Sequence, residues 1–137
     1  MSEISTPLST PNLTGRVAVV TGGSNGIGRA AAVLLARHGA EVHVGDLQPL
    51  AENDSLFAEL GILQKECDVR LESSLKELID EAVAEQGHMD ILVNNAGIGM
   101  VKHITDVTED DWNACIETNL KGPFFGCKHA IRHMQKS

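Results

Sequence analysis

The residues with the clearest chemical potential form a glycine cluster at positions 21–28, Thr-Gly-Gly-Ser-Asn-Gly-Ile-Gly. A β-branched run precedes the cluster and a segment with helical periodicity follows it, so it forms the turn between a strand and a helix. Free backbone amides at a helix N-terminus bind phosphate oxygens, and glycine lets a pyrophosphate approach the backbone closely. The cluster lacks the Gly-Lys-Ser/Thr sequence of a nucleoside-triphosphate P-loop. It predicts a dinucleotide site, although tight strand–helix turns also use glycine for packing alone.

Asp46 adds a second feature of such a site. It ends the next predicted strand, about 20 residues beyond the glycine cluster, where a carboxylate can accept hydrogen bonds from the hydroxyls of the adenosine ribose. A solvated carboxylate at a strand end is the alternative, and the glycine cluster favours the ribose role. A carboxylate repels a 2′-phosphate, and neither Asn25 nor Leu47 offers the positive charge that NADP would need. The pattern favours NAD over NADP.

Composition narrows the class of protein. The chain has 137 residues, of which 42% are hydrophobic, and a net charge of -8, which argues against nucleic acid as a partner. No apolar run approaches the roughly 18 residues that span a bilayer, and the N-terminus lacks a secretory pattern, so we expect a cytoplasmic protein without a membrane partner. Three widely spaced cysteines suit reduced thiols. The sequence contains no tyrosine, which excludes any mechanism that needs a phenol from this chain.

Strands and helices alternate along the chain. Residues 1–12 are rich in Ser, Thr and Pro and predict a disordered arm. Strands are predicted at 16–21, 41–46, 62–68 and 89–94, and helices at 27–38, 49–60, 71–86 and from Thr108 to the C-terminus, with a kink near Gly122-Pro123. This order predicts an α/β fold, a doubly wound parallel sheet that is incomplete, with the first and fourth strands flanking the ligand site. Residues 13–137 therefore resemble the first half of a larger domain.

Four motifs occur in the order seen in the short-chain dehydrogenase/reductase family: Thr21-Gly22-x-x-x-Gly26-x-Gly28, Cys67-Asp68-Val69, Asn94-Asn95-Ala96-Gly97 and Asn119-Leu120-Lys121-Gly122. The chain resembles the N-terminal half of that family's Rossmann-fold domain over roughly residues 12–137. The resemblance implies an NAD(P)-dependent oxidoreductase that transfers a hydride between a small-molecule alcohol or ketone and its cofactor. Family members are commonly dimers or tetramers built around the helix that begins near Thr108, so the complete enzyme is expected to be a homo-oligomer.

The resemblance also implies a role for each matched position. The pyrophosphate and its ribose would contact Gly22, Ser24, Gly26, Ile27 and Gly28, with Asn25 in the same cofactor-binding loop. Asp46 and Leu47 would lie at the adenosine ribose, and Asp68 and Val69 would flank the adenine, Asp68 through its 6-amino group. Asn95, Ala96 and Gly97 would pass along the adenine and ribose. Asn119 would help to hold a water molecule in a catalytic proton relay.

The family's catalytic serine, its tyrosine and the lysine four residues after that tyrosine have no counterparts here. All three would lie beyond Ser137, and of the proton relay only Asn119 is present. The phenol and its neighbouring cation act together, because an unperturbed pKa near 10 is too high for general acid–base work at neutral pH. We therefore expect the chain to be truncated before the Tyr-x-x-x-Lys motif and to be inactive alone.

Two other functions remain open. One is a non-catalytic nucleotide-binding or subunit-interaction chain, and the other is a methyltransferase that uses S-adenosylmethionine, which the Asn-Asn-Ala-Gly motif disfavours. His129 and His133 have the spacing of two metal ligands on a helix, but no third ligand is evident, so an exposed helix face without metal is expected. Cys115, Cys127 and Trp112 are interpreted as packing residues.

Overall fold

The computed structural model describes residues 9–51 and 54–136. Four parallel strands form one sheet in the order β3-β2-β1-β4, with β1 (Val17–Thr21) and β2 (Glu41–Asp46) at its centre and β3 (Leu63–Glu66) and β4 (Ile91–Asn94) outside them. Val19 of β1 pairs with His43 on one side and with Leu92 on the other. From β1 the chain adds β2 and then β3 on one side of the sheet, and it then crosses to the other side of β1 to form β4. The topological switch point therefore lies between β1 and β4, as predicted. The predicted arm falls mostly on residues 1–8, outside the described part.

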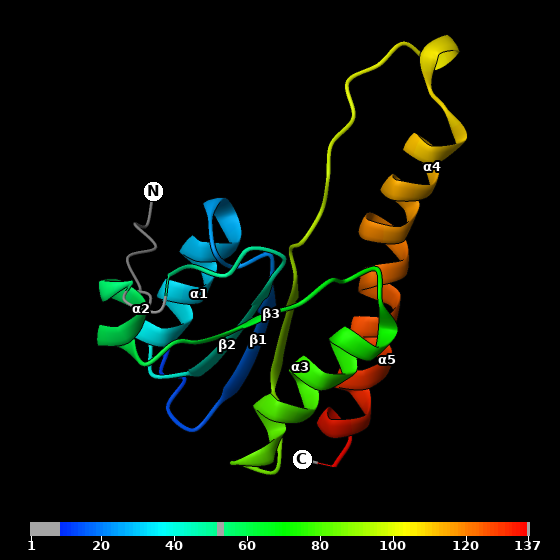
Figure 1. Cartoon of the computed structure of the whole chain (residues 1–137). Helices are drawn as coiled ribbons and strands as arrows, with labels where there is room; N and C mark the ends of the chain where they lie inside the picture. Colours follow the sequence, from blue (N-terminus) through cyan, green and yellow to red (C-terminus); the bar gives the residue numbers. More distant parts are fainter. Residues whose placement is uncertain (1–8, 52–53, 137) are drawn as a thin grey trace, which may run out of the picture.

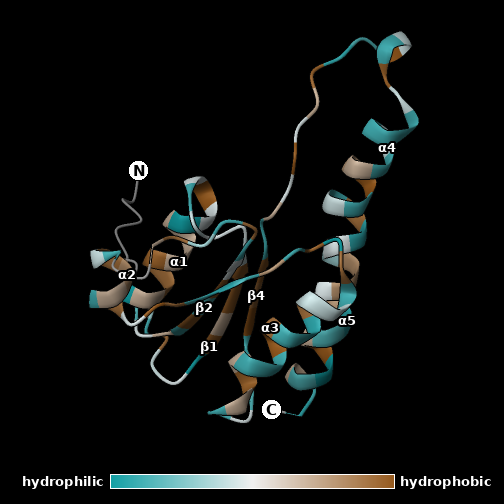
Figure 2. Cartoon of the chain, in the orientation of Figure 1, coloured by the Kyte–Doolittle hydropathy of each residue, from teal (hydrophilic) through white to brown (hydrophobic). Residues whose placement is uncertain are grey.

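Helices cover both faces of the sheet, because successive side chains of a buried strand point to opposite faces. Ala18 and Val20 pack in one apolar cluster with residues of α1 (Gly26–Arg37) and α2 (Ser55–Leu60). Val17 and Val19 pack in a second cluster with residues of α3 (Glu72–Ala84) and α5 (Gly122–Met134). Figure 1 shows the two layers of helices, and Figure 2 shows the hydrophobic residues concentrated in the strands between them. This packing holds the carboxyl ends of the strands open for a ligand.

After β4 the chain leaves the sheet as an extended segment and returns along a long helical column (Figure 1). A short 3₁₀ turn, η1 (Ile104–Asp106), precedes α4 (Glu109–Ile116), whose N-terminus is closed by a capping box between Thr108 and Asp111. A π-helical turn, η2 (Glu117–Lys121), joins α4 to α5. The irregularity therefore lies directly before Gly122-Pro123, where the kink was predicted, because proline cannot supply the backbone N–H of a regular helix.

Several local predictions are wrong. The second helix begins at Ser55 rather than at Pro49, because the carboxylate of Asp54 accepts a hydrogen bond from the Phe57 N–H (3.0 Å) and caps the helix there. Leu71, the first residue of the predicted third helix, lies just before α3 and is 54% exposed. Trp112, interpreted as a packing residue, is 60% exposed, because α4 extends beyond the sheet (Figure 1). Cys127 is also exposed.

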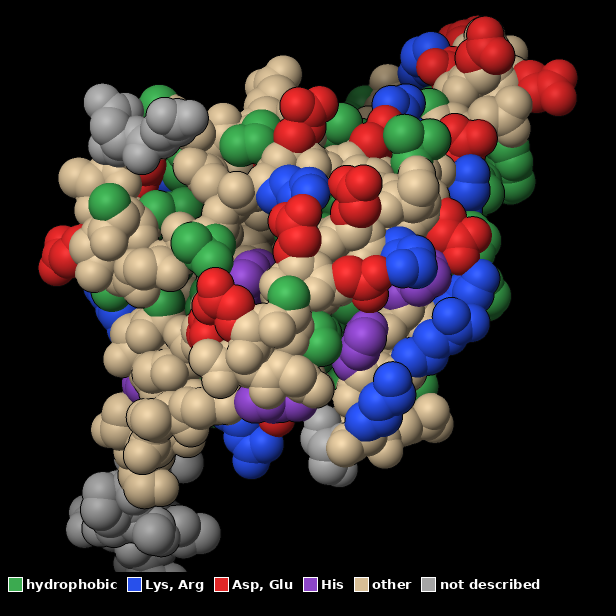
Figure 3. Space-filling model, turned by 60° about the horizontal axis from the view of Figure 1, so that its bottom comes forward, with side chains coloured by type: hydrophobic (Ala, Val, Ile, Leu, Met, Phe, Trp, Pro, Cys, Tyr) green, Lys and Arg blue, Asp and Glu red, His purple; other side chains and the backbone are tan. Residues whose placement is uncertain are grey.

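The two histidines of α5 face α3 rather than solvent. His129 is only 6% exposed, and its Nε2 lies 2.9 Å from Oε1 of Glu72, while Nε2 of His133 lies 3.3 Å from Oδ1 of Asp80. Figure 3 shows histidine side chains lying between acidic and basic groups on the side of the molecule that it presents. Among the described residues no group of three or more His, Cys, Asp or Glu side chains could hold a metal ion. The pair therefore joins two helices.

Candidate functional site

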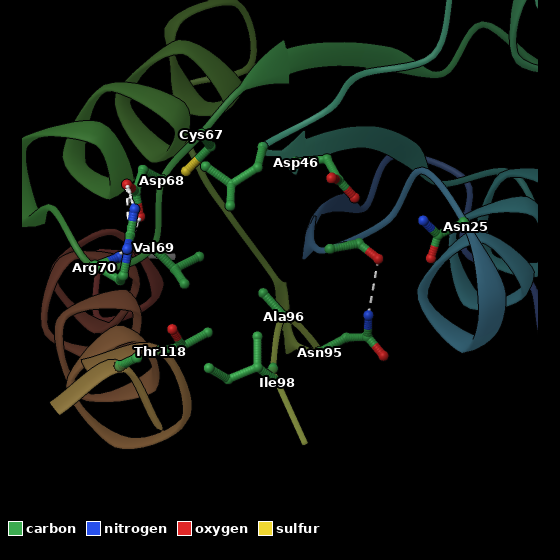
Figure 4. A pocket seen from close by; sticks show the side chains of 14 residues that line it. Asn25, Asp46, Cys67, Asp68, Val69, Arg70, Asn95, Ala96, Ile98 and Thr118 are labelled. Atoms are coloured by element: carbon green, nitrogen blue, oxygen red, sulfur yellow. Dashed lines mark hydrogen bonds and ion pairs between the residues drawn. The ribbon is translucent and has the colours of Figure 1, made fainter. Parts of the chain in front are cut away.

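A cavity of about 350 Å³ opens at the carboxyl ends of β1, β2 and β4, at the point where the winding reverses. Open parallel sheets bind their ligands at this position, because the loops that leave the strands there diverge to opposite faces. Figure 4 shows the side chains that surround the cavity. The lining residues are Gly22, Asn25, Asp46, Leu47, Cys67, Asp68, Val69, Arg70, Asn95, Ala96, Gly97, Ile98, Ala114 and Thr118.

The glycine loop passes close to the segment that follows β4. Gly22 has a φ of +64°, and a Cβ there would lie 2.8 Å from the Cα of Ala96. A Cβ at Gly28 would overlap both the side-chain amide of Asn95 and the carbonyl oxygen of Gly22. Gly26 also has a positive φ, +56°, with open space around it, so its requirement for glycine comes from the backbone conformation. Glycine at positions 22 and 28 therefore lets the loop and the start of α1 pack directly against the segment that follows β4.

Thr21 and Asn95 hold this part of the site together. The Thr21 hydroxyl oxygen, which is almost fully buried, accepts hydrogen bonds from the backbone N–H groups of Asn95 and Ala96, each at 3.2 Å. The side-chain amide of Asn95 donates to the carbonyl oxygen of Gly22 (2.9 Å), the contact drawn in Figure 4. Both residues thus use their polar groups to join the ends of β1 and β4.

Asp46 is held by backbone N–H groups on two sides. Its Oδ2 accepts from the N–H of Ser24 (3.1 Å) and its Oδ1 from the N–H of Gln48 (3.0 Å), so its carboxylate has a defined direction at the cavity wall. The hydroxyl of Ser24 is buried and, within residues 9–51 and 54–136, has no hydrogen-bond partner. A buried hydroxyl without a partner costs about 1–3 kcal/mol, which a polar ligand at the glycine loop could recover.

Asp68 and Arg70 form a charged pair at the opposite wall. Nε and Nη2 of Arg70 lie 2.9 and 2.7 Å from the two carboxylate oxygens of Asp68, a bidentate arrangement. The hydrogen bonds from Arg70 lower the pKa of the Asp68 carboxyl. Cys67, next to this pair, is buried, and burial raises the pKa of its thiol. A protonated thiol is a poor nucleophile, so the site offers no activated cysteine.

Asn119 lies in the π-helical turn η2 and fastens the segment that leaves β4. Its side chain pairs with the backbone of Ile98 in both directions, donating to the carbonyl oxygen and accepting from the N–H at 2.8 Å each. Gly97 lies against the same side chain, since a Cβ there would be 3.2 Å from Oδ1 of Asn119. Single π-turns within α-helices often occur at functional sites. In the described chain the turn brings Thr118, not Asn119, to the cavity.

Comparison with known proteins decides the family. The model of a family described as short chain dehydrogenase matches residues 16–137. The chain belongs to this family. Its members are oxidoreductases that use a nicotinamide cofactor, and the four-stranded sheet with helices on both faces is their Rossmann-like fold. The match decides against the methyltransferase alternative.

Short-chain dehydrogenases of known function and structure align with nearly all of this chain. It is 42% identical to momilactone A synthase of Oryza sativa subsp. japonica over 127 residues, which cover 89% of this chain and 46% of the relative. It is also 42% identical to the mitochondrial borneol dehydrogenase of Lavandula x intermedia, covering 89% of this chain and 48% of the relative. The chain thus spans about half the length of these curated relatives.

Two solved structures show the same arrangement. A Sinorhizobium meliloti structure described as a short-chain alcohol dehydrogenase superimposes with a TM-score of 0.84 and 40% identity, over 92% of this chain and 52% of that one. A short chain dehydrogenase from Burkholderia cenocepacia, solved in complex with NADP, gives a TM-score of 0.79 and 30% identity, over 90% and 52% of the two chains. None of the helices in the described part of this chain combines the length and apolarity needed to cross a membrane.

The structure brings nine of the thirteen predicted cofactor residues to the cavity: Gly22, Asn25, Asp46, Leu47, Asp68, Val69, Asn95, Ala96 and Gly97. The other four, Ser24, Gly26, Ile27 and Gly28, lie in the glycine loop and the first turn of α1 without lining the cavity. Ser24 and Gly28 are buried, whereas Ile27 is 83% exposed. Sequence reasoning missed Cys67, Arg70, Ile98, Ala114 and Thr118 as lining residues. Four of these five flank a matched motif or belong to one, and this adjacency is the signal that could have found them.

Proposed function

We propose that this chain is the cofactor-binding portion of a short-chain dehydrogenase that transfers a hydride between a small-molecule alcohol or carbonyl compound and NAD. The observation that carries the proposal is the Asp46 carboxylate, oriented at the cavity wall by the N–H groups of Ser24 and Gln48. A carboxylate in this place accepts hydrogen bonds from a ribose diol and repels a phosphate on the 2′ oxygen. Leu47 beside it is uncharged and 56% exposed.

The donors and acceptors of the cavity fit a dinucleotide. Gly26, at the start of α1, has open space around it, where the free backbone N–H groups of the helix N-terminus can bind a pyrophosphate. The buried Ser24 hydroxyl could donate to it, and Asn25 lies at the cavity wall. Asp68 and Val69 form the far wall, where an adenine amino group would find an acceptor. When bound, NAD supplies the hydride acceptor, and these residues bind and orient it.

The neighbour from Burkholderia cenocepacia was solved with NADP, so membership of the family does not by itself favour NAD, and the proposed choice rests on local charge. The cavity lining of this chain contains one cationic side chain, Arg70, and Asp68 occupies its fork. The one lining cation therefore lies across the cavity from Asp46, and no lining residue beside Asp46 carries a positive charge for a 2′-phosphate. Isothermal titration calorimetry with NAD and NADP tests the proposal. A dissociation constant for NAD well below that for NADP supports it, and equal or reversed affinities refute it.

The resemblance to the family implies a tyrosine as the proton donor of the chemical step, and this sequence contains no tyrosine. We propose that the 137 residues bind the cofactor but do not turn over alone. Incubation with NADH and a panel of carbonyl compounds tests this directly. NADH oxidation that depends on a carbonyl compound would show that another residue donates the proton.

A subunit-interaction role is the second candidate, favoured by an exposed apolar stripe along α4, η2 and α5. Trp112, Leu120, Phe124 and Ile131 project from this column with exposed fractions of 60%, 62%, 65% and 48%. Exposed apolar patches of this kind are typical of protein interfaces. We propose a homo-oligomer formed through this stripe. Sedimentation velocity of the wild-type chain and of a Phe124→Glu variant tests it, and an unchanged monomer in both samples would refute it.

A further inference from the structure

Arg70 lies on the wall of the cavity where the adenine is proposed to bind, and no motif singled it out. It donates to the Asp68 carboxylate from three nitrogens: its backbone N (3.0 Å) and Nε (2.9 Å) contact Oδ1, and Nη2 contacts Oδ2 at 2.7 Å. The backbone N–H of Asp68 is itself held by the Ser74 hydroxyl oxygen (3.0 Å). Asp68 is therefore held at its carboxylate by Arg70 and at its backbone by Ser74, and together these contacts fix the direction of the carboxylate.

The surrounding charges argue against direct anion binding by Arg70. Asp68 occupies the Nε/Nη2 edge of the guanidinium, and Glu117 of η2 adds a second negative charge that acts on it. Lys121, also in η2, acts in turn on Asp68. The two negative charges of Asp68 and Glu117 thus compensate the two positive charges of Arg70 and Lys121. A phosphate that took the place of Asp68 at this edge would leave that carboxylate partly buried without its partner.

An oriented carboxylate distinguishes purines by their 6-substituent. An ionised carboxylate only accepts hydrogen bonds, so it pairs with the 6-amino group of adenine and repels the 6-oxo group of hypoxanthine. A carboxylate has about four lone-pair sites, and the contacts from Arg70 leave room for one more donor. A freely rotating carboxylate would present these sites less often and would discriminate less well.

We propose that Arg70 is a positioning residue for purine recognition: it holds the Asp68 carboxylate in the direction in which it accepts a hydrogen bond from the 6-amino group of adenine. This inference rests on the proposed dinucleotide site and deepens it, because it assigns the choice of base to a residue outside the cofactor motifs. The guanidinium fork matters as well as the charge, since only a planar fork contacts both oxygens from one side chain.

Calorimetric titration of the 137-residue chain with ADP and with inosine diphosphate, which carries hypoxanthine, tests the proposal. Wild-type protein should prefer ADP. Arg70→Leu should bind ADP about fivefold more weakly, the scale of a charged hydrogen bond that is partly lost, and should bind inosine diphosphate unchanged. Arg70→Lys should recover part of the preference. The matched control is Arg37→Leu, an exposed position at the other end of α1, which should behave as wild type.

The double variant Asp68→Ala/Arg70→Leu separates an indirect role from a direct one. If Arg70 acts through Asp68, its replacement has no further effect on ADP binding once Asp68 is alanine. Additive losses, or an equal loss of both nucleotides in Arg70→Leu, would overturn the inference while leaving the dinucleotide site intact. Failure of the folded wild-type chain to bind ADP would instead refute the proposed function, and the inference with it. Far-UV circular dichroism confirms that each variant is folded.

Discussion

Replacement of Asp46 by alanine should convert a preference for NAD into a weaker preference or into one for NADP. The carboxylate of Asp46 faces the cavity with its direction set by the N–H groups of Ser24 and Gln48. Alanine removes both the acceptor for the ribose hydroxyls and the negative charge that repels a 2′-phosphate. The two cofactors should therefore respond in opposite directions.

The magnitude follows from the two contributions. A hydrogen bond to a charged group contributes about 1.5–3 kcal/mol, so its loss should weaken NAD binding roughly 10- to 150-fold. Two unit charges about 5 Å apart repel by about 3 kcal/mol at an effective dielectric constant of 20. Ions at the open mouth of the cavity screen this to about 1 kcal/mol, which corresponds to roughly fivefold tighter NADP binding. The ratio of the two affinities should change at least about 50-fold.

The assay is calorimetric titration of each variant with both cofactors at one salt concentration. The ratio is more informative than either affinity, because the lost hydrogen bonds to Ser24 and Gln48 could loosen the loop and weaken both ligands together. Asp110→Ala, an exposed aspartate in the first turn of α4, serves as the control. An unchanged ratio in Asp46→Ala would remove Asp46 from the site and refute the reasoning.

Two further predictions concern stability. Gly28→Ala should lower the free energy of unfolding by about 1–3 kcal/mol, because the new methyl group would overlap the Asn95 amide. Urea unfolding measures this change. The control is Gly99→Ala, at an exposed position with open space around it, which should change the free energy of unfolding little. Asp111 has its pKa lowered from 3.8 to about 2, chiefly by its hydrogen bond to Lys102. A carboxyl whose pKa falls on folding stabilises above its ordinary pKa, so wild type should lose stability as the pH falls from about 4 to about 2, and melting curves of Asp111→Asn should show a smaller loss.

The sequence predicted the sheet and the place of the site because both depend on local patterns. Short continuous runs of apolar, largely β-branched residues mark buried strands, and the turn after the first strand needs glycine for its backbone conformation and close contacts. Asp46 could be found because it closes such a strand. These features need no knowledge of distant neighbours.

The features that were missed depend either on contacts between segments far apart in the sequence or on local contacts that compete with the pattern used for the prediction. His129 is buried because Glu72 lies across from it on α3, which the helical periodicity of α5 alone does not show. The second helix begins where Asp54 caps it rather than where Pro49 permits it, a competition between two local signals. Arg70 reaches the cavity because the loop after β3 folds back on itself to pair with Asp68.

The hydrogen bonds of Asn95 constrain the order in which the site can form during synthesis. Its N–H reaches the Thr21 hydroxyl across 74 residues of chain, and its side chain reaches the Gly22 carbonyl oxygen across 73. At about 5–20 residues per second, a ribosome adds that length in roughly 4–15 seconds. Throughout this interval the glycine loop exists without the partner that fixes its conformation. The first motif to be translated is therefore among the last to become ordered, and the nascent chain can acquire a nucleotide only after the fourth strand has emerged.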